Sequence, residues 1–219
     1  MHYLYTIAGL AALLSSAQAV PTQHSTNANL EREVAAQSKG VKLYAKGYSS
    51  ADRYYLNYQR ISQGVNIAVV TAGKDKAPVF WEDNIYKTGI FTDIPGVYPL
   101  GITVQPVTEF DSQYPAEHDV SINVGQSSWL ALDPGYLSGP YAPPRPDPEA
   151  QYLVCDRDVA LGGAGKVPLK VVRLKYTGES VPAGCAVVEF TPECAVLEDL
   201  PAGSSWNHDH AVTLTCSPL

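Results

Sequence analysis

The sequence predicts an all-β fold: a single antiparallel β-sandwich or barrel-like domain that follows an irregular N-terminal lead-in. From residue 41 onward, Tyr, Val, Thr and Ile accumulate in short runs, and Gly or Pro separates these runs at regular intervals. Such spacing is typical of sandwiches and barrels, in which many short strands are joined by turns. The apolar fraction of 45% is ordinary for a globular chain, so a hydrophobic core can form.

Residues 1–19 have the pattern of a signal peptide. The apolar run 7–14 precedes Ala17-Gln18-Ala19, the small-x-small pattern that a signal peptidase accepts. The run is too short to span a bilayer as a helix. We therefore expect a secreted, extracellular protein with no membrane association after signal cleavage.

Residues 20–40 are polar and small, and they predict a flexible lead-in or a short helix over 30–37. Asn29 would cap this helix and Gly40 would end it. The β domain is then expected over 41–219.

Several runs within that domain read as strands. Alternating or continuous apolar residues occur at 65–69, 79–82 and 122–124, and the clearest strand is 167–176. In this last run the apolar residues switch from odd to even positions near Val171–Val172, so they would lie on opposite faces of a regular strand. A β-bulge there would keep them on one face and let the three basic residues reach water. The residues concerned are Lys170, Arg173 and Lys175.

Two segments read as loops. Six prolines lie in residues 134–149, and because proline fixes φ and lacks an N–H donor, this segment is predicted to be a long extended surface loop. The Gly-rich run 162–166 lacks the spacing of a phosphate-binding loop, so a hairpin turn is expected there.

Charge and cysteine content restrict the function classes. The net charge of −7 does not suit a phosphate backbone, so we expect no nucleic-acid partner. No cofactor-binding motif is present, and no cofactor is expected. An even number of cysteines behind a signal peptide favours two disulfides, with three connectivities open; the cysteines are Cys155, Cys185, Cys194 and Cys216.

Two short blocks surround the first two cysteines: Gln151-Tyr-Leu-Val-Cys155-Asp156 and Val181-Pro-Ala-Gly-Cys185-Ala-Val-Val-Glu-Phe190-Thr-Pro. These blocks resemble a family of small fungal secreted proteins that is classed only as a domain of unknown function. The resemblance covers about residues 41–200 and implies that Cys155 pairs with Cys185, which leaves Cys194 for Cys216. The Gly-rich run after Asp156 and the tail beyond Glu193 depart from the family pattern. The family implies no activity.

Tyrosines are the candidate ligand-binding residues. Tyr54 lies in a tyrosine-rich run, and Tyr136 and Tyr141 lie in the proline-rich loop. Exposed aromatic rings bury a large area at little entropic cost, which suits sugar faces or protein partners. Trp81 and Trp129 are expected in the core.

His208 and His210 are candidate metal ligands, because in a strand both side chains would point the same way. The neighbouring Ser and Asn residues favour the alternative, an exposed polar turn, so no metal site is predicted. His118 is interpreted as a solvated loop residue.

These features favour a non-catalytic secreted module that binds carbohydrate or a cell-wall or host protein. One alternative is an extracellular hydrolase that uses an Asp/Glu pair, with Asp156 and Asp158 or Glu189 and Glu193 as the nearest carboxylates in sequence. A small secreted effector or surface protein is the other alternative.

Overall fold

The fold is described from a computed structural model of the chain. The structure describes residues 36–85, 89–94, 98–109, 114, 117–125, 128, 130–132, 135–140, 147–163, 165–200 and 202–218. The predicted signal peptide, most of the predicted lead-in, Trp129 and Tyr141 lie outside these residues.

The described residues form β-strands and one short 3-10 helix, η1 (Lys74–Lys76). The strands, in chain order, are β1 (Ala36–Ser38), β2 (Gly40–Lys46), β3 (Tyr54–Ser62), β4 (Val65–Ala72), β5 (Phe80–Asp83), β6 (Gly89–Thr92), β7 (Leu100–Val104), β8 (His118–Val124), β9 (Gln151–Leu161), β10 (Gly165–Lys175), β11 (Cys185–Ala195) and β12 (Leu214–Cys216). The all-β prediction is confirmed. Among the described residues, no helix is long and apolar enough to cross a membrane.

The main sheet closes on itself as an antiparallel barrel, which resolves the choice between sandwich and barrel. Strands β10, β9, β11 and β2 follow one another, and β2 pairs with β5 at Val41 and Phe80. The sheet continues through β6, β7 and β8, and β8 pairs with β10, which completes the ring. The β3–β4 hairpin also joins this sheet through β2, β8 and β10.

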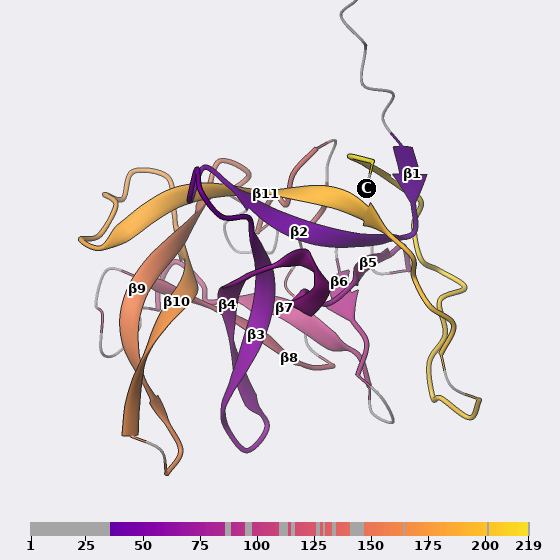
Figure 1. The fold of residues 1–219 in the computed structure, drawn as a ribbon, viewed down its shortest axis with the longest axis horizontal. Helices are drawn as coiled ribbons and strands as arrows, with labels where there is room; N and C mark the ends of the chain where they lie inside the picture. The colour runs from indigo at the N-terminus through magenta and orange to yellow at the C-terminus, as the bar shows by residue number, and fades with distance from the viewer. Residues whose placement is uncertain are drawn as a thin grey trace, which may run out of the picture. The chain divides into compact units, whose positions relative to one another are not determined.

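Two long hairpins, β3–β4 and β9–β10, extend in the same direction in Figure 1. Their tips are joined where the Gly162 N–H donates to the Ile61 carbonyl at 3.0 Å. The Gly-rich run therefore forms a hairpin turn, as predicted.

The barrel encloses the larger of two hydrophobic clusters, whose largest members include Phe80, Phe190 and Leu43. A smaller cluster lies where the two long hairpins approach each other, and it contains Cys155 and Val171. Trp81 is 3% exposed, which confirms its expected place in the interior.

The bulge predicted in β10 is wrong. The register between β9 and β10 runs without interruption from Gly165 opposite Leu161 to Lys175 opposite Gln151. Both faces of β10 are covered instead, because Val171 packs in the smaller cluster and Val172 packs in the larger one.

The predicted exposure of Arg173 is also wrong, since this side chain is 5% exposed. Burying a cation is costly unless it is paired, and Arg173 contacts two carboxylates, those of Glu117 and Asp119. Lys170 stays partly exposed, and hydrogen bonds to Tyr48 and Asp156 raise its pKa.

The N-terminal part of the described chain belongs to the β structure. β1 pairs with β12, with Ala36 opposite Cys216, in a separate two-stranded sheet. Of the helix expected over 30–37, residues 30–35 lie outside the described residues, and Ala36 and Gln37 are strand residues.

Candidate functional site

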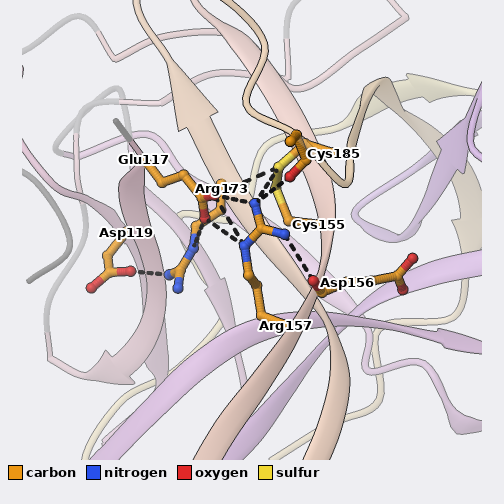
Figure 2. The surroundings of a disulfide bond; sticks show 8 residues. Glu117, Asp119, Cys155, Asp156, Arg157, Arg173 and Cys185 are labelled. Carbon is orange, nitrogen blue, oxygen red and sulfur yellow. Dashed lines mark hydrogen bonds and ion pairs between the residues drawn. A yellow bond between two sulfur atoms is a disulfide. The ribbon is translucent and has the colours of Figure 1, made fainter. Parts of the chain in front are cut away.

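Four side chains form what we call the buried charge cluster, in which Asp119 lies at the surface and the other three side chains are at most 9% exposed: Glu117, Asp119, Arg157 and Arg173 (Figure 2). Both arginines, one from β9 and one from β10, donate to the Glu117 carboxylate, and Arg173 also pairs with Asp119 on β8. Two cations therefore face two carboxylates, so the charges balance. No periodic pattern in the sequence indicates this cluster, because Glu117 lies 40 and 56 positions from the two arginines that it contacts.

The buried charge cluster lies against the Cys155–Cys185 disulfide (Figure 2). Arg157 Nη2 lies 3.1 Å from Cys185 Sγ, and it also donates to the Ala183 carbonyl at 2.9 Å. Glu117 and the two cysteines are close enough to hold a metal ion. Cysteine binds a metal ion as the thiolate, and the sulfurs of Cys155 and Cys185 are both joined in the disulfide. The cluster is therefore saturated by its own members, which indicates an architectural role.

His118 is not a solvated loop residue, as the sequence suggested, but a fully buried residue at the start of β8. Its Nδ1 lies 2.6 Å from the Glu109 carbonyl oxygen, and its Nε2 lies 3.0 Å from the Glu179 carboxylate. The ring also packs edge-on against Tyr176. Burial raises the pKa of Tyr176 to about 12, with the charges of Glu179 and Asp147 adding to the effect.

A second constellation lies beside an open cleft of about 1110 Å³, which we call the C-terminal cleft. Its walls come from β1, from the end of β11 and from the segment that follows β11. Val196, Leu197 and Leu200 supply apolar surface, and Trp206 and His208 supply rings. Polar side chains complete the lining; they include Gln37, Lys39, Asp199, Asn207 and Asp209.

Asp93, directly after β6, holds the two rings of the cleft in place. Its Oδ1 accepts from Trp206 Nε1 at 3.1 Å and from Trp81 Nε1 at 3.2 Å, and its Oδ2 lies 2.9 Å from His208 Nε2. Trp81 also packs edge-on against His208. One carboxylate on the barrel thus contacts three ring N–H groups, two of them from the C-terminal tail.

Three further ties fix this tail on the barrel. The Asn84 N–H donates to the His210 carbonyl at 3.1 Å, and the Val212 N–H donates to the Glu82 carbonyl at 2.9 Å. The Cys194–Cys216 disulfide closes the segment covalently. The cleft wall is therefore tied to the barrel at both ends and at Asp93.

A stacked aromatic pair, of which Tyr98 is exposed and Trp206 is half-buried, borders the cleft. Tyr98, which is 59% exposed, stacks on Trp206 with ring centroids 6.3 Å apart and an interplanar angle of 26°. This pair combines an accessible aromatic surface with nearby polar groups. Sequence reasoning did not identify Asp93, Tyr98 or Trp206, because the contacts that join the first two to the C-terminal tail are long-range, spanning 113 positions for Asp93 and Trp206.

The tyrosines proposed from the sequence lie elsewhere. Tyr54 packs edge-on against Tyr48, near Lys170. Tyr136 is 43% exposed and lines a separate cavity of about 450 Å³. Tyr141 lies outside the described residues.

His208 and His210 lie in a turn, so the strand geometry that would align them as metal ligands does not apply. His208 points its Nε2 at Asp93, whereas His210 is exposed. The segment is a turn, but it is not exposed throughout as expected, because the His208 side chain is only 14% exposed.

The four carboxylates considered for hydrolysis each have their own environment. Asp156 and Glu189 are surface residues that pair with Lys170 and Lys46, and Asp158 is exposed. Glu193 is buried.

The buried Glu193 carboxylate is covered by three side chains, those of Arg53, Lys74 and Tyr55. Burial lowers the pKa of Lys74, and the nearby cations Arg53 and Lys42 lower it further. Burial raises the pKa of Tyr55, whose hydroxyl donates to Glu193. This carboxylate is fully engaged by its neighbours, which argues against a role in hydrolysis.

Residues 37–194 match the model of one protein family, described as Domain of unknown function (DUF7907). No curated protein and no solved structure matches this chain. The matched range contains the barrel, the buried charge cluster and the Cys155–Cys185 disulfide, whereas the cleft residues from Ala195 onward lie beyond it.

Proposed function

This chain belongs to the DUF7907 family, whose description assigns no activity, and we propose that it is an extracellular, non-catalytic module that binds carbohydrate in the C-terminal cleft. The observation that carries the proposal is the Tyr98–Trp206 pair at the edge of a cleft that also contains polar side chains. Two disulfides fit an oxidising, extracellular compartment.

Carbohydrate fits this cleft for two physical reasons. Aromatic rings offer flat apolar faces on which the C–H faces of a sugar pack, and amide, hydroxyl and carboxylate groups satisfy its hydroxyls. Trp206 provides the ring, and Ser38, Asn207 and Asp209 are among the polar groups of the lining. The volume of about 1110 Å³ also suits a small-molecule or oligosaccharide ligand.

Preorganisation supports the same function. Because Asp93 fixes the indole of Trp206 and the tail is tied to the barrel, little conformational entropy would be lost on binding. A rigid binding surface of this kind suits recognition without chemistry.

The test is co-sedimentation of the purified protein with insoluble chitin, β-glucan and cellulose, with released sugar assayed in the same tubes. We expect binding to at least one polymer, no sugar release, and loss of binding in Trp206→Ala. Tyr54→Ala and Tyr136→Ala are matched controls, because they remove aromatic rings outside the cleft and should bind like the wild type.

Three results would contradict the proposal. Loss of binding in the control variants, with normal binding in Trp206→Ala, would move the site to the tyrosines. Sugar release would replace the binding module with a hydrolase, and absence of binding to all polymers by the folded protein would exclude these glycans as ligands.

A further inference from the structure

Asp93 is a carboxylate with an unusual set of neighbours, since three ring N–H donors converge on its two oxygens. A carboxylate only accepts hydrogen bonds, and an indole N–H only donates. Both indoles use Oδ1, which leaves Oδ2 for His208 at 2.9 Å.

This arrangement fixes the proton on the imidazole. A neutral imidazole carries its proton on one nitrogen, and the hydrogen bond that each nitrogen makes decides which one. Because Asp93 accepts at Nε2, the proton belongs on Nε2, and Nδ1 keeps its lone pair. His208 lines the C-terminal cleft, whereas Asp93 is not one of the lining residues.

We propose that Asp93 is the positioning residue of the C-terminal cleft: it orients Trp206 and holds His208 as the Nε2–H tautomer, so that Nδ1 accepts a hydrogen bond from a hydroxyl of the bound sugar. This inference rests on the proposed function and makes it more specific. The ligand must place an apolar sugar face on the indole and a hydroxyl donor beside the imidazole.

The substitution Asp93→Asn tests the tautomer with almost no change in shape. An amide has one carbonyl oxygen, and the two indoles compete for it, so its NH₂ group turns toward His208. The imidazole must then accept at Nε2, and its proton moves to Nδ1. An amide in place of an orienting carboxylate is known to favour the wrong histidine tautomer.

The first measurement is the ¹⁵N chemical shifts of the His208 ring in mildly alkaline buffer, with His208→Ala used to assign the signals. We expect the Nε2–H tautomer in the wild type and the Nδ1–H tautomer in Asp93→Asn. The Nε2–H tautomer in both proteins, or the Nδ1–H tautomer in the wild type, would overturn the proposal. A merely structural role of Asp93 would not exchange the two tautomers.

The second measurement is affinity for soluble chitohexaose, laminarihexaose and cellohexaose. Loss of the hydrogen bond that the His208 Nδ1 accepts should weaken binding about tenfold in Asp93→Asn. Asp52→Asn is the matched control, since it neutralises an exposed carboxylate that does not line the C-terminal cleft and should bind like the wild type. Equal affinity of Asp93→Asn and the wild type would overturn the positioning role.

The two proposals fail in different ways. If the wild type binds none of the three sugars, the proposed function fails, and the ring shifts still decide the role of Asp93 in the free protein. If Asp93→Asn does not fold, His208→Gln replaces it, because its amide retains hydrogen-bonding capacity but cannot present the imidazole lone pair. Its affinity should also fall about tenfold, and unchanged affinity would overturn the proposal.

Discussion

Arg173 and Glu117 form an ion pair inside the domain, with 3.1 Å between Nε and Oε2 and with neither side chain more than 5% exposed. Removing one partner of such a pair leaves an uncompensated charge out of water. Removal of Glu117 affects two cations, because Arg157 pairs with the same carboxylate.

Glu117→Ala should therefore lower the free energy of unfolding by about 3–5 kcal/mol. The matched control is Glu189→Ala, which breaks an exposed pair with Lys46 and should cost less than about 1 kcal/mol. Urea denaturation of both variants measures the difference. Equal losses would show that the buried charge cluster contributes no more than a surface pair.

His118→Ala should also destabilise the domain, by about 2–4 kcal/mol, because it leaves a cavity in place of a fully buried ring and removes the hydrogen-bond partner of two acceptors. These acceptors are the Glu109 carbonyl and the Glu179 carboxylate. His210→Ala, at an exposed position, is the control and should leave the thermal midpoint unchanged. A similar midpoint for both variants would contradict the buried role of His118.

Stability should fall between about pH 10 and pH 12, partly because of Tyr176. Burial raises the pKa of this phenol to about 12, so the folded state keeps its proton where the unfolded chain loses it near pH 10. The folded state then binds more protons, and the free energy of unfolding falls as pH rises, by up to about 2–3 kcal/mol.

Thermal unfolding across this pH range measures the effect. Tyr176→Phe should give a shallower slope than the wild type, because the titrating group is gone. Tyr55, whose pKa is also raised, adds a contribution of the same sign in both proteins. Parallel slopes for the two proteins would contradict the assignment to Tyr176.

The two disulfides should differ in their effect on binding. Each closes a loop of 22 or 30 residues, so replacing either pair with Ser should cost roughly 3–4 kcal/mol of stability. Only the Cys194–Cys216 pair borders the C-terminal cleft, because Cys194 is one of its lining residues.

Loss of Cys194–Cys216 should therefore weaken glycan binding at temperatures where both double variants are folded. Loss of Cys155–Cys185 should leave the affinity unchanged. Co-sedimentation with both double variants measures the difference. An equal loss of affinity in the two would contradict a specific role of the Cys194–Cys216 disulfide in binding.

Local patterns predicted the strands well. The run 65–69 lies within β4, and 167–176 corresponds to β10, because period-two alternation and turn residues are local properties. The pairing of Cys155 with Cys185, which the family resemblance implied, is confirmed. The expectation that the chain belongs to a family of unknown function is confirmed over residues 37–194, without the fungal origin or the two sequence blocks.

The predictions of exposure were wrong where a partner from a distant part of the chain allows a polar residue to be buried. Arg173 and His118 look like surface residues in sequence, and both are buried because carboxylates from other strands or turns face them. The parity change in β10 suggested a bulge, but a second cluster covers the other face of that strand. Local hydropathy contains no information on either partner.

The candidate site was missed for a similar reason. Sequence reasoning selected tyrosines by their number and their place in loops, whereas the cleft depends on a carboxylate after β6 and on rings of the C-terminal tail. The contact between Asp93 and His208 joins residues 115 positions apart. Only the closed barrel brings them together.

The most direct test of cleft binding is a titration of the ¹⁵N-labelled protein with chitohexaose, laminarihexaose and cellohexaose, followed by the indole N–H signals. Three tryptophans give three such signals, which Trp206→Phe assigns in part. We predict that at least one sugar shifts the Trp206 signal, together with backbone signals of residues 196–200 and 207–209. Shifts confined to residues around Tyr54 or Tyr136, with the Trp206 signal unchanged, would contradict the assignment of the binding site to the C-terminal cleft.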